Sequence, residues 1–491
     1  MRHTKIVATL GPSSTSKEMI KRLIHKGVNV FRLNCSHSKH EDMRDVIEII
    51  RITAKESSLV CPAILIDLQG PKIRIARFKD GSVHLQEGQQ FILDQDCPKT
   101  DGDETRVGFH YDNLVKDVGI GDELILDDGN MTLEVVAKTK RAIKTRVITT
   151  GILGSNKGIN LKDGGLTAPS FTEKDARDLD FAIEQDVDFV ALSFVKNAND
   201  VFSVREKITQ SKKYIQVISK IERSDALKYI DEIAKVSHGL MIARGDLALE
   251  IGFAKVPAVQ KQIIKVGKQN NNFVIVATQM MESMITNNHP TRAEVSDVAN
   301  AILDHADALM LSAETAMGVH PDHVVQSMNE ICLETESHVK YLKLERQLQP
   351  DTKNVSMVIA DQAIQVGHVL GAKAVVIFTE FGATVQYASR HDSKIPIFGM
   401  SRINKTCQRT QIYRGVTPIG VTYDRLDYEN INIMAAKHLR PIIDFNDEDL
   451  VVIVKGDMIG VTGHTNSLEV WSANMLLGDM SVSQQYEESD C

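Results

Sequence analysis

Eight short segments, apolar until they end in polar residues, constrain the fold of this chain most strongly. Continuous apolar runs of this length are typical of buried parallel strands. One helical pattern of suitable length precedes each of the last five of them, at 173–184, 198–210, 224–235, 256–269 and 292–304. Strands that alternate with helices in this way predict a (β/α)₈ barrel, the TIM barrel. The eight expected strands are 5–10, 28–35, 63–68, 188–194, 217–222, 241–246, 273–279 and 308–312.

An open, doubly wound sheet is the alternative architecture for alternating strands and helices. Such a sheet is expected to carry a glycine-rich dinucleotide fingerprint after its first strand. The first expected strand is followed instead by Gly11-Pro12-Ser13, which does not have that pattern. The sequence therefore favours the closed barrel.

Two further domains are expected beside the barrel. The interval 71–167 lacks helical periodicity and carries Asp-Gly turn signals at 80–81 and 128–129, which predict an inserted, all-β domain with a β-barrel form. Its place after the third barrel strand predicts a lid over the active site. Strand and helix patterns resume beyond the barrel and predict a C-terminal α/β regulatory domain. We expect the barrel at 1–70 and 168–343, the lid at 71–167, and the third domain at 344–491.

Composition and charge narrow the function classes. The net charge of −8 argues against nucleic acid as a main partner, and no apolar run approaches the length of a membrane span. The six cysteines form no CxxC pair, which is typical of free thiols in a reducing compartment. We therefore expect a cytoplasmic enzyme of the soluble, globular class, with neither nucleic acid nor a membrane as partner.

The polar residues at the expected strand ends form one chemically coherent set. Arginine and lysine favour an anionic, phosphorylated substrate, and paired carboxylates favour Mg²⁺ or Mn²⁺. A lysine that faces a cation-neutralised phosphate is the arrangement of phosphoryl transfer. No Walker A motif is present, so side chains and metal would have to hold nucleotide phosphates. The set comprises Arg32, Asn34, Ser36, Asp67, Lys220, Glu222, Asp246, Thr278, Ser312 and Glu314.

Eight sequence blocks resemble the signature blocks of the pyruvate kinase family. They are RLNCSH, DLQGPKIR, NKGINL, ISKIE, IARGDL, ATQMMESM, PTRAEVSDVANA and LSAETA, and the resemblance extends over essentially the whole chain. The family transfers a phosphoryl group from phosphoenolpyruvate to ADP, which gives pyruvate and ATP. The resemblance implies the same reaction here, with Mg²⁺ or Mn²⁺ as cofactor and with a homotetrameric assembly.

The resemblance also implies roles for individual residues. Lys220 matches the lysine that stabilises the phosphoryl group in flight, and Glu222 and Asp246 match the divalent-metal ligands. The phosphoenolpyruvate carboxylate site matches Gly245, Asp246 and Thr278, and Thr278 also lies near the enolate that must be protonated. Arg32 matches a contact to the substrate phosphate. The nucleotide contacts match Asn34, Ser36, His37, Arg74 and Lys157.

A potassium requirement is not expected. In potassium-dependent relatives the positions that match Asn34, Ser36, Asp67 and the Leu68 carbonyl hold the ion, and the nearby segment reads Asp-Thr-Lys-Gly-Pro-Glu. This chain reads Asp67-Leu68-Gln69-Gly70-Pro71-Lys72, so that a lysine replaces an acidic residue. An ammonium there would repel K⁺ and supply the positive charge itself. The resemblance is thus to a bacterial-type, potassium-independent subgroup.

An effector site is expected in the C-terminal domain. The turn that contains Thr379, Gly382 and Thr384 leads from a strand into a helix, where hydroxyls and amides suit a phosphate. The neighbouring Glu380 and Phe381 argue against a bisphosphate, and the loop 462–466 is expected to lie opposite. A sugar monophosphate or a nucleotide monophosphate is the predicted activator.

Two other function classes remain open from sequence. Metal-dependent aldolases on the same barrel bind pyruvate enolates, but they lack the inserted β domain and the C-terminal domain. A catalytically inactive scaffold protein is the second alternative, and the intact set Lys220, Glu222, Asp246 and Thr278 argues against it. Formation of pyruvate from phosphoenolpyruvate and ADP distinguishes all three.

Overall fold

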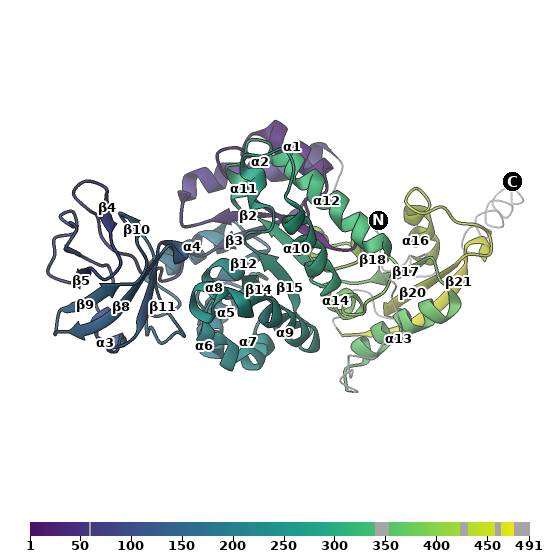
Figure 1. Ribbon diagram of the computed structural model, residues 1–491. Coiled ribbons are helices and arrows are strands. Elements are labelled where there is room, and N and C mark those ends of the chain that lie inside the picture. The colour runs from purple at the N-terminus through teal and green to yellow at the C-terminus, as the bar shows by residue number, and fades with distance from the viewer. Residues whose placement is uncertain (58–59, 339–352, 423–430, 457–462, 476–491) are drawn as a thin grey trace, which may run out of the picture.

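The computed structural model places three domains side by side, with the barrel between the other two (Figure 1). It describes residues 1–57, 60–338, 353–422, 431–456 and 463–475. The expected boundary between barrel and C-terminal domain, at 343 and 344, lies outside these residues.

Eight parallel strands close into a barrel, as predicted, in the order β1-β16-β15-β14-β13-β12-β3-β2. Each strand contains a continuous apolar stretch and is almost wholly buried. Burial on both faces explains why the sequence shows continuous apolar runs. The strands are β1 (Lys5–Thr9), β2 (Val30–Asn34), β3 (Ala63–Asp67), β12 (Phe189–Leu192), β13 (Gln216–Ile221), β14 (Gly239–Ala243), β15 (Phe273–Ala277) and β16 (Ala308–Leu311).

Helices cover the outside of the barrel and bury their apolar faces against the strands. Thr172 and Asp175 form a capping box at the start of α4, and another box at Thr291 and Glu294 starts α10. The main helices are α1 (Lys17–His25), α2 (His40–Glu56), α4 (Glu173–Glu184), α5 (Ala198–Gln210), α6 (Ser224–Lys228), α7 (Ile230–Val236), α8 (Arg244–Ile251), α9 (Val256–Gln269), α10 (Arg292–Leu303), α11 (Ala313–Ala316) and α12 (Pro321–His338).

The lid lies between β3 and α4 and is built from two sheets around its own apolar core. A six-stranded sheet has the order β11-β7-β8-β9-β5-β6, and β10 pairs with β4. One short helix, α3 (Leu114–Asp117), interrupts an otherwise all-β domain. The strands are β4 (Ser82–Leu85), β5 (Gln90–Asp94), β6 (Arg106–Val107), β7 (Glu123–Leu126), β8 (Met131–Lys138), β9 (Ala142–Val147), β10 (Gly151–Gly154) and β11 (Ile159–Leu161).

The C-terminal domain is a five-stranded sheet in the order β19-β18-β17-β20-β21, with β21 antiparallel to β20. Its strands are β17 (Ala374–Phe378), β18 (Ile397–Ser401), β19 (Val416–Gly420), β20 (Leu450–Gly456) and β21 (Thr465–Ser472). Its described helices are α13 (Val355–Leu370), α14 (Ala383–Ser389), α15 (Asn404–Thr410) and α16 (Ile431–Leu439).

The C-terminal domain packs on the N-terminal ends of the barrel strands, opposite the ends that carry the candidate site. Tyr413 is buried with its ring centroid 5.9 Å from that of Phe273, the first residue of β15. Buried ion pairs join the same surfaces: Arg390 is fully buried against Asp307, and Lys405 lies 3.1 Å from Asp188. Among the described residues, the C-terminal domain therefore packs against the barrel end that lies opposite the candidate site.

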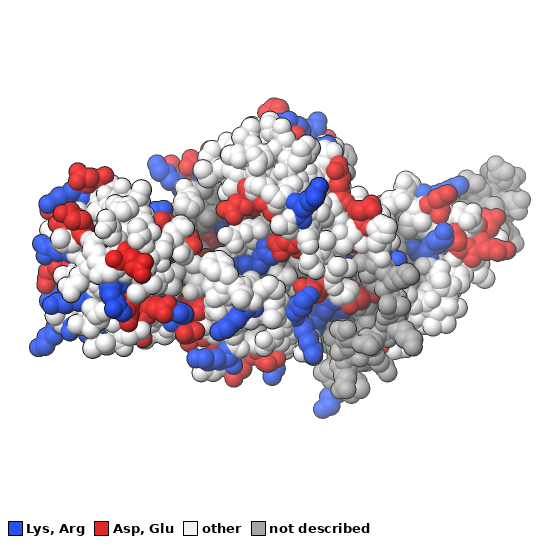
Figure 2. All heavy atoms as spheres, viewed as in Figure 1, with Lys and Arg blue, Asp and Glu red and all other residues white. Residues whose placement is uncertain are grey.

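Acidic and basic side chains are interspersed over the face of the molecule shown in Figure 2. In the described part of the chain, no helix is both long enough and apolar enough to cross a membrane. The five cysteines that the structure describes, Cys35, Cys61, Cys97, Cys332 and Cys407, are free thiols.

Candidate active site

A buried cluster of four charged side chains occupies the C-terminal ends of β2, β3 and β13. The Nζ atom of Lys220 lies 2.9 Å from Glu222 Oε1 and 3.3 Å from Asp67 Oδ1. Arg32 donates from Nε to the second carboxylate oxygen of Asp67 at 2.7 Å. Strands β2 and β3 are neighbours in register at Asn34 and Asp67, which brings these residues to one edge. The structure thus joins four residues that the sequence predicted separately.

The charges in this cluster are mutually dependent. Burial alone would lower the pKa of Lys220, but the carboxylates of Asp67 and Glu222 outweigh burial and raise it, so the ammonium stays charged. Burial would raise the pKa of Asp67, and Lys220 and Arg32 together lower it. Burial, with Asp246 in addition, raises the pKa of Glu222 against the opposing effect of Lys220. A divalent cation beside Glu222 and Asp246 would relieve the repulsion between the two carboxylates.

The second candidate metal ligand, Asp246, lies in the first turn of α8, directly after β14. The backbone N–H of Gly245 donates to Thr278 Oγ1 at 2.9 Å, which joins the start of this helix to the end of β15. Thr278 has a φ of 68°, in the left-handed region that a β-branched residue rarely adopts. The structure therefore brings Gly245, Asp246 and Thr278 together, and the strained turn fixes the Thr278 hydroxyl at the helix start.

These residues fit a hard divalent cation of the Mg²⁺ type. The described residues contain no cluster of three or more His, Cys, Asp or Glu side chains arranged to hold a metal. Mg²⁺ does not need such a cage, because it commonly binds through one or two carboxylates and completes its shell with water and substrate oxygens. Glu222 and Asp246 are the two carboxylates that could hold such an ion.

Ser312 and Glu314 lie at the end of β16. Glu314 is 2% exposed, burial raises its pKa, and its Oε2 accepts a hydrogen bond from the Ser312 N–H at 2.6 Å. The Ser312 hydroxyl is buried and makes no hydrogen bond in the structure. An unpaired hydroxyl beside a carboxyl group suits a site through which a proton passes.

The predicted nucleotide-binding residues divide between barrel and lid. Asn34 and Ser36 share a turn after β2, where the Ser36 N–H donates to Asn34 Oδ1 at 3.0 Å, and the exposed His37 follows. Burial, Arg74, Arg32 and Lys72 lower the pKa of His37, so these residues face a common region.

Arg74 and Lys157 approach that region from the lid. Arg74 donates to the Asn156 carbonyl at 3.0 Å, and Lys157 pairs with Asp127 at 2.6 Å. Arg74 thus lies within electrostatic range of His37, whereas Lys157 is paired within the lid.

Lys72, at the root of the lid, is the residue that the sequence analysis expected to supply a positive charge in place of K⁺. Its Nζ lies 3.6 Å from Asp246 Oδ1 and 4.0 Å from Asp128 Oδ1. The predicted pocket positions have partners of their own: Asp67 pairs with Arg32 and Lys220, and the Leu68 carbonyl accepts from Ser193 Oγ at 2.7 Å. Lys72 thus places its charge beside the candidate divalent-metal ligand.

A pocket opens between the lid and the barrel beside this ion pair. Lys72 and Asp246 contribute to its wall together with the buried Arg223 and Glu250. The remaining lining residues are Pro71, Ile73, Ile159, Asn160, Leu166, Ala168 and Phe194.

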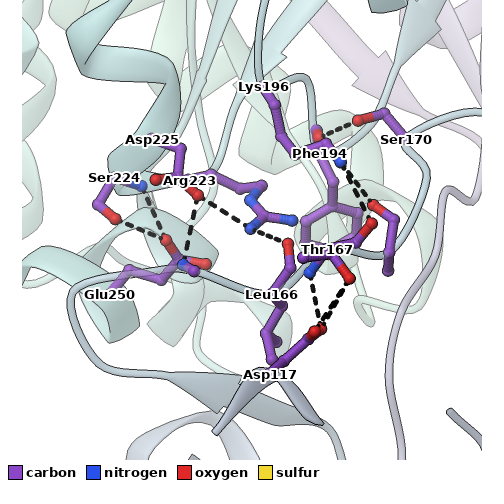
Figure 3. Close-up of polar contacts among 12 residues, drawn as sticks. Asp117, Leu166, Thr167, Ser170, Phe194, Lys196, Arg223, Ser224, Asp225 and Glu250 are labelled. Atoms are coloured by element: carbon purple, nitrogen blue, oxygen red, sulfur yellow. Dashed lines mark hydrogen bonds and ion pairs between the residues drawn. The ribbon is translucent and has the colours of Figure 1, made fainter. Parts of the chain in front are cut away.

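The segment that returns from the lid to the barrel borders the pocket (Figure 3). Arg223 donates to the Leu166 carbonyl at 2.7 Å, and Lys196 donates to the Ala168 carbonyl at 2.9 Å. On the lid side, the Thr167 N–H donates to Asp117 at 2.8 Å. Side chains of the barrel and of the lid therefore both bind the short connecting segment 166–168, which we call the hinge.

Ser193 and Phe194 were missed by the sequence analysis. Ser193 Oγ accepts a hydrogen bond from Lys220 Nζ at 2.8 Å, and the Phe194 N–H donates to Glu222 Oε2 at 2.7 Å. The signal that found the other residues, a polar side chain at a strand end, was also present at Ser193. It was overlooked because the expected strand ran through Phe194, whereas β12 ends at Leu192.

The predicted effector residues lie in the C-terminal domain, away from this cluster. The Gly382 N–H donates to Thr379 Oγ1 at 2.9 Å, and the hydroxyls of Thr384 and Thr465 lie 3.0 Å apart. The loop expected opposite therefore approaches through Thr465, while its first residue, Thr462, lies outside the described residues. Glu380, which was expected to disfavour a bisphosphate, pairs with Arg402 at 2.8 Å.

A TIM barrel with a lysine, an arginine and acidic side chains at its C-terminal face, covered by a lid, defines a metal-dependent enzyme class that acts on small phosphorylated anions. Comparison with known proteins identifies the family. The pyruvate kinase barrel-domain model matches residues 1–325, and the pyruvate kinase alpha/beta-domain model matches residues 357–471. The chain therefore belongs to the pyruvate kinase family, a family of phosphotransferases.

Curated relatives match over nearly the whole chain. A pyruvate kinase of Buchnera aphidicola subsp. Schizaphis graminum is 42% identical over 96% of this chain and 98% of the relative. Pyruvate kinase II of Salmonella typhimurium is 40% identical over 96% and 98%, respectively. A pyruvate kinase of Staphylococcus aureus is 39% identical over 99% of this chain and 82% of the relative. The predicted family is confirmed, and the lyase and scaffold alternatives lose their support.

Proposed function

We propose that this chain transfers the phosphoryl group of phosphoenolpyruvate to ADP at the C-terminal face of the barrel, the last step of glycolysis. A terminal oxygen of ADP attacks phosphorus, the bond from phosphorus to the enol oxygen breaks, and the enolate of pyruvate takes up a proton at carbon. The observation that carries the proposal is the buried cluster in which Lys220 lies 2.9 Å from Glu222, with Arg32 bound to Asp67 beside it.

The side chains divide this chemistry among them. Lys220 would stabilise negative charge on the phosphoryl group in flight, and Arg32 would bind a phosphate oxygen. The amides of Gly245 and Asp246, at the start of α8, would hold the substrate carboxylate together with the Thr278 hydroxyl. Thr278, with Ser312 and Glu314, would deliver the proton to the enolate. The ADP phosphates would meet Asn34, Ser36 and His37 from the barrel and Arg74 and Lys157 from the lid.

Glu222 and Asp246 would hold Mg²⁺ or Mn²⁺, which supplies Lewis-acid neutralisation of the phosphate charge. Asp67 and Glu222 together keep the Lys220 ammonium charged. Glu222 would then be a partner of both the cation and Lys220, and Lys220 would keep Asp67 as its second carboxylate partner.

The enzyme is proposed to work without potassium, as the bacterial-type subgroup with lysine at this position would. Support comes from the Lys72 ammonium 3.6 Å from Asp246, and from Arg32 and Lys220, which already neutralise Asp67. The charge that K⁺ would bring is thereby supplied by the chain itself.

A coupled assay of pyruvate formation tests the reaction and the potassium proposal together. In a tetramethylammonium buffer with Mg²⁺, phosphoenolpyruvate and ADP should yield pyruvate at the full rate. Absence of pyruvate would refute the function. A rise of about tenfold or more when K⁺ is added back, roughly 1.4 kcal/mol in the barrier, would refute potassium independence alone.

Lys220→Met tests the proposed catalytic lysine. Turnover should fall by several orders of magnitude, because the ammonium acts on charge that develops in the transition state. The fold should persist, since Arg32 still pairs with Asp67. Lys235→Met, at an exposed lysine of α7, is the matched control. Near-normal turnover in a folded Lys220→Met variant would overturn the assignment.

Regulation and assembly are proposed from the C-terminal turn and from the family, respectively. The turn with Thr379, Gly382 and Thr384 is proposed to bind a sugar monophosphate or a nucleotide monophosphate that activates the enzyme. Titration of AMP, a hexose monophosphate and a hexose bisphosphate against sub-saturating phosphoenolpyruvate tests this; activation by the bisphosphate alone would contradict it. A cytoplasmic homotetramer is proposed from the family, and light scattering of the purified protein tests the tetramer.

A further inference from the structure

Ser193 presents a buried hydroxyl to the proposed catalytic lysine. It follows β12 directly and is 1% exposed. Its Oγ accepts from Lys220 Nζ at 2.8 Å and donates to the Leu68 carbonyl at 2.7 Å. A serine hydroxyl has one hydrogen, so the donation to Leu68 leaves its lone pairs for the ammonium. The Ser193 hydroxyl can therefore act toward Lys220 only as a hydrogen-bond acceptor.

We propose that Ser193 is a positioning residue that orients the Lys220 ammonium for phosphoryl transfer; this rests on the proposed function of Lys220. An ammonium has three N–H donors, and here they face Ser193, Glu222 and Asp67. Glu222 is a proposed metal ligand and Asp67 is bound by Arg32. Ser193 is the one neutral partner among the three.

A neutral partner can position the ammonium without the added negative charge that a third carboxylate would bring. It fixes the position of Nζ without adding negative charge next to the ammonium. A further carboxylate would weaken the attraction between Lys220 and a negatively charged phosphoryl group. Ser193 thus positions the Lys220 ammonium without neutralising it, while Asp67 keeps the lysine charged.

The turn that carries Ser193 is itself held in place. Phe194 has a φ of 55°, in the left-handed region, and its N–H donates to Glu222 Oε2 at 2.7 Å. Its carbonyl accepts from Ser170 Oγ at 2.7 Å (Figure 3). On the other side Gly70 packs so closely that a Cβ there would lie 2.8 Å from the Ser193 Cβ.

One turn therefore holds the catalytic lysine through a side chain and the metal carboxylate through the backbone. Such support from neighbouring residues is what keeps a catalytic constellation within a fraction of an ångström of its working geometry. Without the hydroxyl, the ammonium is expected to relax onto Glu222 and Asp67. It would then sit farther from the phosphoryl group and compete more strongly with the divalent cation.

Steady-state kinetics of Ser193→Ala, Ser193→Cys and Ser193→Thr test this proposal. We expect kcat to fall about tenfold to a hundredfold in the alanine and cysteine variants, while KM for phosphoenolpyruvate changes by less than about threefold. The concentration of Mg²⁺ for half-maximal activity should rise. Cysteine is similar in shape to serine but is a weak hydrogen-bonding group. Threonine retains the hydroxyl, so Ser193→Thr should keep most of the wild-type kcat.

Ser219→Ala is the matched control. Ser219 is a fully buried serine of β13 whose hydroxyl lies 2.6 Å from that of Ser237, so this variant also loses a buried hydrogen bond. Its kcat should stay within about twofold of the wild type. In a Lys220→Met background, Ser193→Ala should leave the residual rate unchanged, because the residue acts only through the ammonium.

A folded Ser193→Ala variant with kcat within about twofold of the wild type would overturn the proposal. So would a loss of kcat that is equal in Ser193→Ala and Ser219→Ala and follows their unfolding temperatures. These outcomes differ from failure of the proposed function, in which the wild-type enzyme itself would form no pyruvate.

Discussion

The Lys72 ammonium lies 3.6 Å from Asp246 Oδ1, so a lysine at the root of the lid pairs with a proposed metal ligand of the barrel. The pair spans the boundary between two domains, because Lys72 lies at the start of the lid sequence and Asp246 lies in the first turn of α8. Its side chains are 28% and 23% exposed, which leaves the pair reachable from solvent. Closure of the lid and the charge at the metal site are therefore physically linked.

Lys72→Glu should create a potassium requirement. The substitution places a carboxylate beside Asp246 and Asp128, so the local charge falls by two units and a monovalent cation becomes favourable. We expect at least about a tenfold activation by K⁺ in this variant and none in the wild type. Lys79→Glu makes the same charge change at an exposed lid position and serves as control. Indifference of Lys72→Glu to K⁺ would show that Lys72 does not replace the cation.

Glu222→Gln should raise the Mg²⁺ concentration needed for activity. The amide keeps the size of the side chain and can still face Lys220, but one anionic ligand is lost. We expect the Mg²⁺ activation curve to shift by about tenfold or more, roughly 1.4 kcal/mol. Glu334→Gln, on an exposed position of α12, is the comparison. An unchanged Mg²⁺ curve would remove Glu222 from the metal site.

His238 should contribute to the acid sensitivity of the fold. Its Nδ1 accepts a hydrogen bond from the Val217 N–H at 3.0 Å, which requires a neutral ring nitrogen. Burial, with Arg205 adding to it, lowers the pKa of His238 to about 4 from 6.5. Between these pH values the unfolded chain binds more protons than the folded one, so stability present above pH 6.5 is lost as the pH falls toward 4.

The measurement is the free energy of unfolding as a function of pH. The loss from His238 should reach up to about 3 kcal/mol, and His238→Asn, which can still accept from Val217, should show a shallower acid slope between pH 6.5 and 4. His338→Asn, at an exposed histidine of α12, should retain the wild-type slope. Parallel slopes in wild type and His238→Asn would contradict the prediction.

Much of the fold was predictable because local signals and tertiary packing agree. The helices α4, α5 and α9 begin and end where the sequence predicted, since capping boxes start α4 and α5, a proline lies in the first turn of α9, and apolar periodicity marks their extent. The expected helix at 224–235 was wrong in one respect: Tyr229 breaks it into α6 and α7. The antiparallel β21 was not predicted, because its residues are mostly part-exposed and lack a continuous apolar run.

The candidate site was likewise predictable in part, where local sequence signals and tertiary packing agree. Lys220, Glu222, Arg32 and Asp67 could be predicted because each lies in or directly after the C-terminal half of a barrel strand, and closure of the barrel brings them together. The Lys72–Asp246 pair could not, because it depends on how the lid sits on the barrel. The role of Phe194 also escaped prediction, since it comes from a backbone N–H in a left-handed turn, which no side-chain pattern reveals.

Arg223 should couple the lid hinge to the metal site. Its side chain is 4% exposed, donates to the Leu166 carbonyl at 2.7 Å, and pairs with Asp225 at 3.1 Å (Figure 3). The Arg223 Nε is buried in the structure without a hydrogen-bond partner, so the guanidinium is held by one end only. Arg223 also directly follows Glu222. Any movement of the hinge at Leu166 therefore pulls on the strand end that presents a proposed metal ligand.

Arg223→Met removes the barrel side of this hinge while it retains an unbranched, apolar stem. We expect KM for ADP to rise about threefold to tenfold with a smaller change in kcat, because the lid would close less often over the nucleotide. Amide hydrogen exchange at residues 163–168 should become faster. Arg205→Met is the matched control, since Arg205 also donates to a backbone carbonyl, that of Val236, at 2.7 Å but lies outside the hinge. If Arg223→Met and Arg205→Met show the same exchange at 163–168 and the same KM for ADP, Arg223 does not hold the hinge.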